Sequence, residues 1–314
     1  MIHTPLCDLL GIRYPVFQGG MAWVSEGKLA AAVSEGGGLG IIGAGNAPAD
    51  YVREQVHVAK SLTDKPFGVN IMLLSPFADD VAKVVAEEKV PVVTTGAGNP
   101  SKYMKLWHEA GTKVIPVVPS VAMAKLMTRL GASALIAEGG ESGGHIGELT
   151  TMVLVPLVCD ATDLPVLAAG GIADGRGAAA AFMLGACGIQ MGTRFLSAEE
   201  CVIHPNYKEK IVKAGDLCTA VTGRRLGHPV RSLRTSFTRG YAKVEYTDIS
   251  DDDLEALGTG ALRLAVQEGD LENGCFLSGQ IAAMVKQIQP AADIIRDVME
   301  GAEEVLKGAG KWVR

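Results

Sequence analysis

Short apolar runs alternate with amphipathic segments along most of this 314-residue chain. Eight apolar runs occur, at 15–18, 39–42, 67–70, 90–95, 114–118, 134–137, 166–169 and 188–191. Segments with helical spacing lie between them at 25–34, 49–61, 78–88, 101–110, 121–130 and 175–184. This alternation is typical of parallel strands connected by helices, and eight strands are the number that closes a (β/α)8 TIM barrel. We therefore predict an α/β fold of the TIM-barrel type rather than an open doubly wound sheet.

The alternation stops after Arg194, where a segment of mixed charge begins. This segment contains an arginine-rich stretch at 222–234 and a short acidic run at 248–253. A last amphipathic helix is predicted at 291–306. We expect residues 1–199 and 271–314 to form the barrel, and residues 200–270 to form a small inserted subdomain.

Composition excludes several classes of function. The formal net charge of −6 and the pI near 5.6 argue against a nucleic-acid-binding protein. The six cysteines are scattered without a C-x-x-C pair, so we expect reduced thiols and no metal site. The N-terminus has no apolar signal core, and the apolar run at 178–191 is too short to cross a bilayer. We therefore expect a cytoplasmic protein that binds neither membranes nor nucleic acids.

The sixth apolar run leads into a loop at 138–147 that contains five glycines, two glutamates and one histidine. Glycine allows the backbone to approach a ligand closely, and His145 carries the side chain that titrates nearest neutral pH. A surface turn with a solvent-facing histidine is the alternative interpretation. Because the loop directly follows a buried strand, we favour a functional site.

The loops after the seventh and eighth runs have the composition of a phosphate site, and in TIM barrels these two loops often hold a phosphate group. Here they are Ala169–Gly175 and Gln190–Phe195, whose glycines expose backbone N–H groups. Thr193 adds a hydroxyl donor, and Asp174 is placed to cap the helix that follows. Two tight turns that need glycine only for their geometry are the alternative. Because both loops follow the expected strands, we favour phosphate binding.

Polar or glycine-rich residues also follow the early strands. Gly20, Met21 and Ala22 would allow the main chain to line one face of a ring. Asn70 either hydrogen-bonds a flat heterocycle or caps a turn. FMN, which is planar and phosphorylated, would use these residues together with the phosphate loops. A sugar phosphate would use the phosphate loops alone.

Seven stretches of the chain carry a resemblance to a known family. They are Pro15–Trp23, Lys65–Pro76, Thr94–Pro100, Glu138–Gly147, Ala168–Gly175, Gln190–Phe195 and Ser278–Ile281. In these stretches the chain closely resembles the FMN-dependent enoyl-acyl-carrier-protein reductases (isoform II), within the wider nitronate monooxygenase (2-nitropropane dioxygenase-like) superfamily. The resemblance extends from about residue 5 to about residue 285.

The resemblance implies a reductase of bacterial fatty-acid elongation. NADH or NADPH would reduce FMN, and the flavin would pass hydride to the β-carbon of a trans-2-enoyl thioester carried on the phosphopantetheine of an acyl carrier protein. His145 is implied as the catalytic residue, which stabilises the thioester enolate or donates the α-proton. The residues implied to bind the cofactor are Gly20, Met21, Ala22, Asn70, Glu138, Gly143, Gly144, Gly170, Gly171, Gln190, Met191, Gly192 and Thr193. A homodimer is a further expectation from the family.

Other functions compete with this interpretation. In nitronate monooxygenases, which oxidise nitronates with O2, the matching histidine removes a proton, so His145 alone does not decide between the two enzymes. A flavin-binding protein without turnover is disfavoured by the intact histidine. An enzyme of the IMP dehydrogenase type would need a cysteine in the loop after the sixth strand, and this loop has none.

A group of arginines in the mixed-charge segment is a second candidate binding feature. It comprises Arg224, Arg225, Arg231, Arg234 and Arg239. Guanidinium groups suit an acidic carrier protein or the phosphates of a nicotinamide cofactor. Ion pairs with the acidic run at 248–253 are the alternative.

Overall fold

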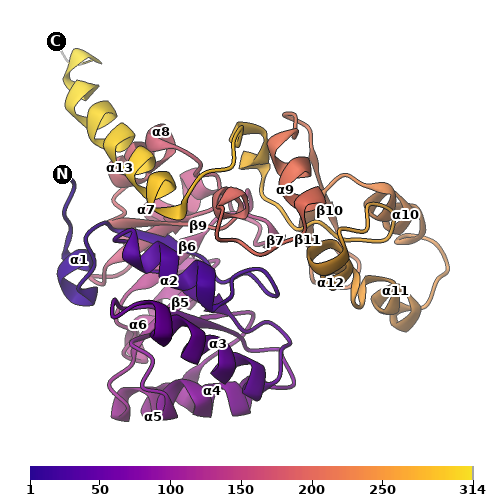
Figure 1. Ribbon diagram of the computed structural model, residues 1–314, viewed down its shortest axis with the longest axis horizontal. Coiled ribbons are helices and arrows are strands. Elements are labelled where there is room, and N and C mark those ends of the chain that lie inside the picture. The colour runs from indigo at the N-terminus through magenta and orange to yellow at the C-terminus, as the bar shows by residue number, and fades with distance from the viewer. Residues whose placement is uncertain (313–314) are drawn as a thin grey trace.

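The computed structural model describes residues 1–312 and confirms the predicted barrel (Figure 1). Its eight strands are β1 (Val16–Gln18), β2 (Ile41–Gly43), β3 (Gly68–Met72), β4 (Val92–Gly96), β5 (Lys113–Val118), β6 (Leu135–Glu138), β8 (Val166–Ala169) and β9 (Gly188–Met191). They pair in the order β1-β9-β8-β6-β5-β4-β3-β2, and every pairing is parallel. All carboxyl ends therefore lie on one rim, from which the candidate site loops emerge.

The barrel closes between β1 and β2 through a buried glutamine. Phe17 forms an isolated parallel bridge with Leu39. Beyond this bridge, the Gln18 side chain accepts a hydrogen bond from Ile41 N and donates one to Ile41 O, both at 3.2 Å. The Gln18 side chain thus takes the place of backbone hydrogen bonds between β1 and β2 at this point. Because its amide oxygen and nitrogen are both hydrogen-bonded, the side chain can be buried without leaving a polar group unsatisfied.

Helices cover the outside of the barrel, as predicted, with one addition. They are α2 (Gly27–Glu35), α3 (Ala49–Leu62), α4 (Ala78–Glu87), η1 with α5 (Ser101–Tyr103 and Met104–Glu109), α6 (Val121–Arg129), α7 (Thr151–Cys159) and α8 (Gly175–Met183). The sequence prediction has no counterpart of α7. This helix is apolar on every side and contains Pro156, so it lacks the periodicity that marks an amphipathic helix.

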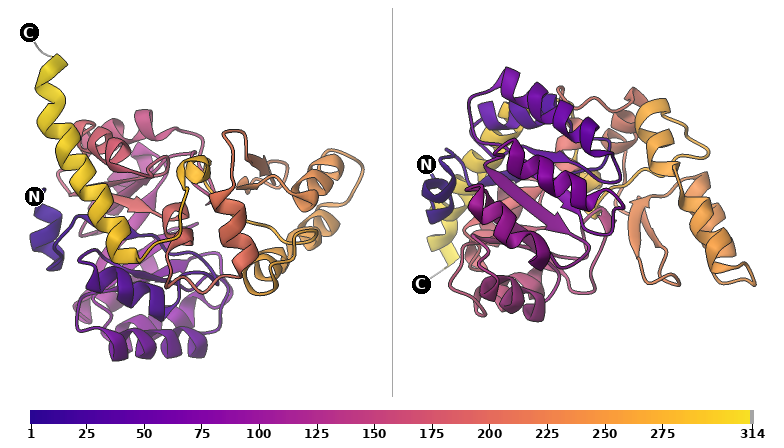
Figure 2. Two further views of the ribbon diagram at one scale, coloured as in Figure 1. Left: turned by 45° about the horizontal axis from the view of Figure 1, so that its top comes forward. Right: turned by 90° about the horizontal axis from the view of Figure 1, so that it is seen from below.

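The amino-terminal end of the barrel is closed by an apolar core. Leu6 and Leu10 of α1 (Pro5–Leu10) belong to one buried cluster with Phe17, Ile41 and other strand residues. Two larger clusters lie between the strands and the surrounding helices. The last long helix, α13 (Ala291–Gly308), returns to pack on α8 and α2 (Figure 2). The rim at the carboxyl ends of the strands is therefore the end of the barrel that is available to a ligand.

The chain between β9 and α13 projects from the side of the barrel (Figures 1 and 2). Its elements are η2 (Thr193–Ser197), α9 (Pro205–Val212), β10 (Thr219–Thr222), β11 (Val230–Leu233), α10 (Ser236–Val244), α11 (Asp251–Gly258), α12 (Ala261–Arg263), η3 (Leu264–Glu268) and η4 (Gln280–Met284). β10 and β11 form an antiparallel hairpin, and β11 also pairs with β7 (Gly144–His145). The projecting segment is thus joined to the loop that carries His145.

Two further findings bear on the class of protein. All six cysteines are free thiols, as their scattered positions suggested. Within residues 1–312, no helix combines the length and the hydropathy that a membrane span requires.

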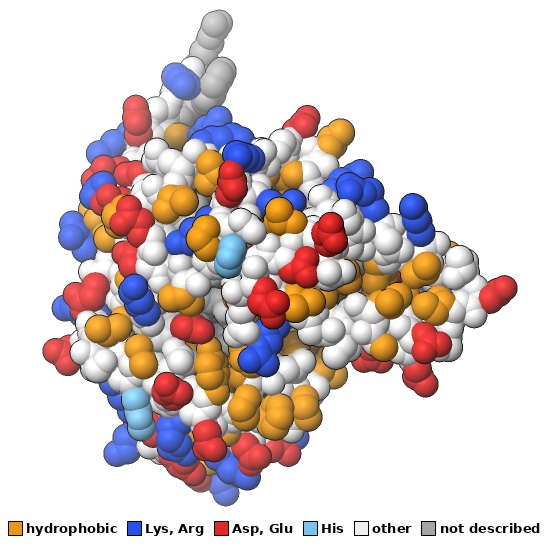
Figure 3. Space-filling view, turned by 45° about the vertical axis from the view of Figure 1, so that its right-hand side comes forward, with side chains coloured by type: hydrophobic (Ala, Val, Ile, Leu, Met, Phe, Trp, Pro, Cys, Tyr) orange, Lys and Arg blue, Asp and Glu red, His pale blue; other side chains and the backbone are white. Residues whose placement is uncertain are grey.

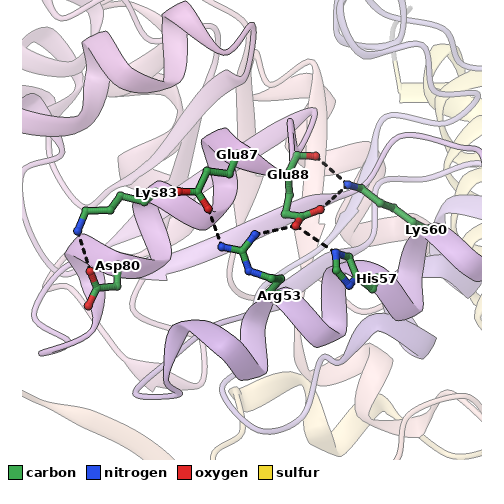
Figure 4. A network of polar contacts seen from close by, with 7 residues as sticks. All are labelled: Arg53, His57, Lys60, Asp80, Lys83, Glu87 and Glu88. Carbon is green, nitrogen blue, oxygen red and sulfur yellow. Dashed lines mark hydrogen bonds and ion pairs between the residues drawn. The ribbon is translucent and has the colours of Figure 1, made fainter.

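A network of ion pairs joins α3 to the end of α4 on the outside of the barrel (Figure 4). The Glu88 carboxylate accepts hydrogen bonds from Arg53, His57 and Lys60 at 2.8, 3.0 and 2.8 Å. These hydrogen bonds lower the pKa of Glu88 to about 2, and the bond from Lys60 makes the largest contribution. Because the folded pKa is depressed, the stabilisation is present above the unfolded value near 4.5 and is lost as the pH falls through about 2.

We predict that Glu88→Gln lowers the free energy of unfolding at pH 7 by about 1–2 kcal/mol, a loss that shrinks as the pH falls toward 2. Urea titrations at pH 7 and pH 3 measure the change. Asp80→Asn is the control, since the side chains of the Asp80–Lys83 pair are 63% and 61% exposed and such pairs contribute little. Equal losses of unfolding free energy in Glu88→Gln and Asp80→Asn would show that the Glu88 network stabilises the fold no more than an exposed ion pair does.

Candidate functional site

The carboxyl-terminal rim of the barrel surrounds a cavity of about 290 Å³. Every residue that the sequence analysis assigns to the site lies on its wall: Gly20, Met21, Ala22, Asn70, Glu138, Gly143, Gly144, His145, Gly170, Gly171, Gln190, Met191, Gly192 and Thr193. They come from the ends of β1, β3, β6, β8 and β9 and from the loops that follow. Figure 3 looks onto the side where the projecting segment meets the barrel, and hydrophobic side chains gather along this junction.

The loops after β8 and β9 present unused hydrogen-bond donors to the cavity. Gly170 and Gly171 have φ values of 86° and 73°, a left-handed conformation that favours glycine. Within residues 1–312, no acceptor is found for the N–H groups of Gly171, Gly192 or Thr193. The Thr193 hydroxyl accepts a hydrogen bond from Gly279 N at 2.8 Å, which leaves its own proton free to be donated. This donor set suits an anion such as a phosphate.

The helix that follows the β8 loop begins as predicted. The Asp174 carboxylate accepts hydrogen bonds from Arg176 N at 3.0 Å and Gly177 N at 3.2 Å, and so caps α8. The cap satisfies N–H groups beyond the loop and fixes the direction in which α8 leaves the rim. Gly170 and Gly171 are therefore held between a buried strand and a capped helix.

Gly20 and Asn70 touch across the rim. A Cβ on Gly20 would lie 2.2 Å from Asn70 Cβ, so glycine alone fits here. The Thr94 hydroxyl donates to Asn70 Oδ1 at 2.9 Å, which leaves the amide nitrogen to donate into the cavity. Asn70 lies within β3 and caps no turn. Its position therefore agrees with a contact to a ligand rather than with a capping role.

His145 belongs to a loop that is held by strand pairing rather than by the barrel alone. His145 and Gly144 of β7 pair with Val230 and Arg231 of β11. The imidazole lies on the cavity wall and is exposed to it. Desolvation lowers its pKa, and the nearby His228 lowers it further. At neutral pH the ring is therefore mostly neutral, with one nitrogen able to donate a proton and the other able to accept one.

The arginines of the mixed-charge segment have separate roles. Nε and Nη2 of Arg231 both donate to the carbonyl of Gly140, at 3.2 and 2.9 Å, and so tie the His145 loop to the hairpin. Arg225 pairs with Asp251 at 2.8 Å, as the ion-pair alternative proposed. Arg224 lies 3.9 Å from Glu148, and Arg231 and Arg234 both donate to Thr219.

We predict that Arg231→Ala lowers turnover about tenfold, because the two hydrogen bonds that fix the His145 loop are lost. Hydrogen exchange should accelerate in residues 138–147, while the circular dichroism of the protein changes little. Arg239→Ala is the matched control, since within residues 1–312 its guanidinium makes one exposed contact, with Ser236 at 3.4 Å. Unchanged exchange of the loop in Arg231→Ala would show that the anchor is unnecessary.

The two glutamates of the His145 loop differ in their surroundings. The Glu141 carboxylate accepts hydrogen bonds from the backbone N–H and hydroxyl of Thr151, both at 2.9 Å, and so caps α7. Glu138 lies on the cavity wall, where burial raises its pKa to about 7 and the Ser142 hydroxyl opposes the rise. Ser142 Oγ is itself buried and makes no hydrogen bond of normal geometry within the described chain. An unsatisfied hydroxyl of this kind is suited to a polar ligand.

We predict a pH-dependent stability that depends on Glu138. Because its folded pKa is raised, its favourable contribution is complete below the unfolded value near 4.5 and is lost as the pH rises through about 7. Glu138→Gln should therefore reduce the loss of stability between pH 5 and pH 8 by about 2–3 kcal/mol. Urea titrations at pH 5 and pH 8 measure the change in the free energy of unfolding, with the exposed Glu148→Gln as the control. If the free energy of unfolding depends on pH in the same way in the wild type and in Glu138→Gln, the raised pKa of Glu138 is not the cause of the pH dependence.

Sequence reasoning missed an apolar part of the cavity wall. It is formed by Leu196, Tyr207, Leu262, Leu277 and Ile281. The buried Tyr207 hydroxyl donates to the carbonyl of Leu277 at 2.6 Å and fixes this wall. These residues lie on η2, α9, α12 and the approach to α13, where the chain has no strand-helix alternation. The motif Ser278–Ile281 is the one sequence signal that pointed to this wall.

Known proteins are similar to this chain in both the barrel and the projecting segment. Residues 3–87 and 77–301 match the family model described as nitronate monooxygenase. The structure of FabK from Thermotoga maritima is 53% identical, covers 100% of both chains and superposes with a TM-score of 0.97. A (3aS,4S,5R,7aS)-5-hydroxy-7a-methyl-1-oxo-octahydro-1H-indene-4-carboxyl-CoA dehydrogenase from Mycobacterium tuberculosis is 33% identical over 99% of each chain. A probable nitronate monooxygenase from Staphylococcus saprophyticus is 32% identical over 97% of this chain and 99% of its own. The chain therefore belongs to the nitronate monooxygenase family of oxidoreductases.

Proposed function

We propose that this protein is an FMN-dependent enoyl-acyl-carrier-protein reductase, which uses NADH or NADPH to reduce trans-2-enoyl thioesters in fatty-acid elongation. The motifs that resemble this class of reductase are spread over most of the length of the chain. The similarity to FabK supports the proposal, because its 53% identity exceeds the 32% of the probable nitronate monooxygenase and spans the entire chain.

The polar half of the cavity fits FMN. The N–H groups of Gly171, Gly192 and Thr193 and the Thr193 hydroxyl would hold the phosphate. The main chain at Gly20 and the amide of Asn70 would face the ring system, and the unsatisfied Ser142 hydroxyl also belongs to a residue that lines the cavity. When bound, FMN supplies hydride transfer from the nicotinamide to the β-carbon of the substrate.

The observation that carries the proposal is that apolar side chains line the same cavity as these polar groups. Five side chains, Leu196, Tyr207, Leu262, Leu277 and Ile281, line it. An acyl chain gains free energy by leaving water for such a surface, whereas a small charged nitronate has little apolar area to bury. A thioester substrate also agrees with the CoA thioester in the name of the Mycobacterium tuberculosis relative.

In this proposal, His145 would act on the thioester. Its lowered pKa leaves a neutral imidazole, whose N–H can donate to the carbonyl oxygen as negative charge develops there. The same ring can pass a proton to the α-carbon as the bond is reduced. Arg231 and the β7–β11 pairing would keep the ring at a constant position over the reacting atoms.

Oxidation of nitronates is the second candidate, and one observation favours it. A histidine that is neutral at pH 7 has a ring nitrogen free to accept a proton, which is the role of the matching histidine in that reaction. The family model and the Staphylococcus saprophyticus relative bear the name of that activity.

A pair of assays separates the two candidates. Protein loaded with FMN is given NADH or NADPH with a crotonyl thioester under nitrogen, and separately a nitronate under air. We expect nicotinamide oxidation with formation of the saturated thioester in the first assay, and oxygen uptake no faster than the background in the second. The proposal fails if nicotinamide is not consumed and oxygen uptake depends on the nitronate. Transfer of the crotonyl group from CoA to acyl carrier protein should lower KM.

A further inference from the structure

Trp23 has a left-handed backbone conformation that bulky residues rarely adopt. Its φ is 62°, and a positive φ at an aromatic residue persists only where the surrounding structure holds it. The residue lies in a tight turn, in which the carbonyl of Met21 accepts hydrogen bonds from Val24 N at 3.1 Å and Ser25 N at 2.9 Å. Its two neighbours in the chain, Ala22 and Val24, line the cavity. Strained residues of this kind cluster at functional sites.

Two side chains from other elements hold the indole ring of Trp23. The guanidinium of Arg263, in α12, lies over the ring with its Cζ 5.1 Å from the centroid. Arg263 Nε donates to Gln267 Oε1 at 2.7 Å, which directs the guanidinium. The centroid of the Tyr51 ring, in α3, lies 5.6 Å from that of the indole, and the Tyr51 hydroxyl donates to Glu26 at 2.7 Å. Tryptophan is the aromatic ring that attracts a cation most strongly, at distances up to about 6 Å.

The contact between Arg263 and Trp23 joins the projecting segment to the rim of the barrel. Another such attachment is the backbone pairing of β11 with β7, in the loop that follows β6. In the sheet, β8 and β9 lie between β6 and β1, so the two attachments are on different parts of the rim. Leu262, which precedes Arg263, lines the cavity. The contact therefore connects two segments that both contribute to the cavity wall.

We propose that Arg263 is a positioning residue for the flavin site and acts through Trp23. By holding the indole ring, Arg263 fixes the turn that presents Gly20, Met21 and Ala22, the residues assigned to the cofactor in the proposed function, on which this inference rests. Arg263 is itself exposed and does not belong to the residues that line the cavity. Its effect on a bound flavin is therefore transmitted by the indole rather than by direct contact.

The packing around the turn explains why one exposed contact can affect the cavity. Trp23 is half-buried and packs against both of the larger apolar clusters of the barrel. Met21 N donates to Ser25 Oγ at 2.7 Å, so the turn is closed by a side chain as well as by backbone hydrogen bonds. A Cβ on Gly43 would lie 2.5 Å from the carbonyl oxygen of Met21, which shows how closely the turn approaches β2. A displacement of the indole is therefore passed to Met21 and Ala22, because the turn has little room to absorb it.

Hydrogen exchange of residues 19–25 in the full chain and the Kd of FMN test the proposal. In Arg263→Ala we expect faster exchange of the turn and a rise of the Kd by about fivefold or more, the range of one cation–π contact. Lysine keeps a cation that can lie over the ring, so Arg263→Lys should stay within about twofold of the wild type. Arg129→Ala is the matched control, because Arg129 is exposed at the end of α6. It should change neither quantity.

A double-mutant cycle separates action through Trp23 from a direct effect of the charge. In a Trp23→Leu background, the further change Arg263→Ala should alter the Kd of FMN by less than about twofold. An undiminished effect in that background would overturn the proposal, and so would Arg263→Lys being as impaired as Arg263→Ala. The comparison of alanine with lysine stays decisive if Trp23→Leu does not fold.

The same measurements distinguish this inference from the proposed function. A wild type that binds no FMN would be a failure of the proposed function. A wild type that binds FMN with the same Kd as Arg263→Ala, and with the same exchange of residues 19–25, would be a failure of this inference alone.

Discussion

Replacing His145 by glutamine is expected to lower the turnover of a crotonyl thioester by about 100-fold or more, the usual contribution of a positioned proton donor. The FMN content should remain near that of the wild type, because His145 lies on β7 and not among the donors of the β8 and β9 loops. Glutamine keeps an N–H but cannot transfer a proton at neutral pH, so it separates proton transfer from hydrogen bonding. Steady-state rates per bound flavin measure the effect.

His228→Gln is the control for this prediction. His228 is exposed and lowers the pKa of His145, so its removal should keep most of the activity and move the pH profile upward. A His145→Gln enzyme whose rate per flavin is within a factor of two of the wild type would remove the histidine from the mechanism. An unmoved profile in His228→Gln would show that the two rings do not interact.

The second large effect is expected from Gly20→Ala. The new methyl group would stand 2.2 Å from Asn70 Cβ, so Asn70 or the β1 loop must move. Overpacking of this kind costs about 1–3 kcal/mol, and the moved groups are those assigned to the flavin ring. We expect the Kd of FMN to rise roughly 10- to 100-fold, since 1.4 kcal/mol corresponds to a factor of ten. Titration of the cofactor-free protein with FMN measures it.

Gly96→Ala is the matched control, because Gly96 also lines the cavity and a Cβ there would meet no atom within 4 Å. FMN affinity should change little in this variant. An unchanged Kd in Gly20→Ala, or an equal rise in both variants, would show that the contact between Gly20 and Asn70 does not shape the flavin site.

The barrel and the polar half of the cavity were predictable from sequence because both depend on local patterns. Each strand ends in its own glycine-rich or polar tip, and parallel pairing brings these tips to one rim whatever the details of packing. Gly171 and Thr193, which are 22 positions apart in the chain, could therefore be assigned to one site.

The remaining features of the site depend on contacts between distant residues. The apolar wall needs Tyr207 to meet Leu277 across 70 positions, and Arg231 reaches Gly140 across 91. No spacing rule connects such pairs. Helix α7 was missed for a different reason, because an apolar helix with an internal proline has no periodic signal.

The most direct test of the proposed function is a single turnover. The FMN-loaded protein is reduced under nitrogen with one equivalent of NADH or NADPH and is then mixed with crotonyl thioester. We expect the flavin to return to its yellow, oxidised form within the catalytic cycle time, with one saturated thioester formed per flavin. A flavin that stays reduced with the thioester, but is reoxidised when oxygen is admitted, would contradict the reductase and favour the nitronate-oxidising alternative.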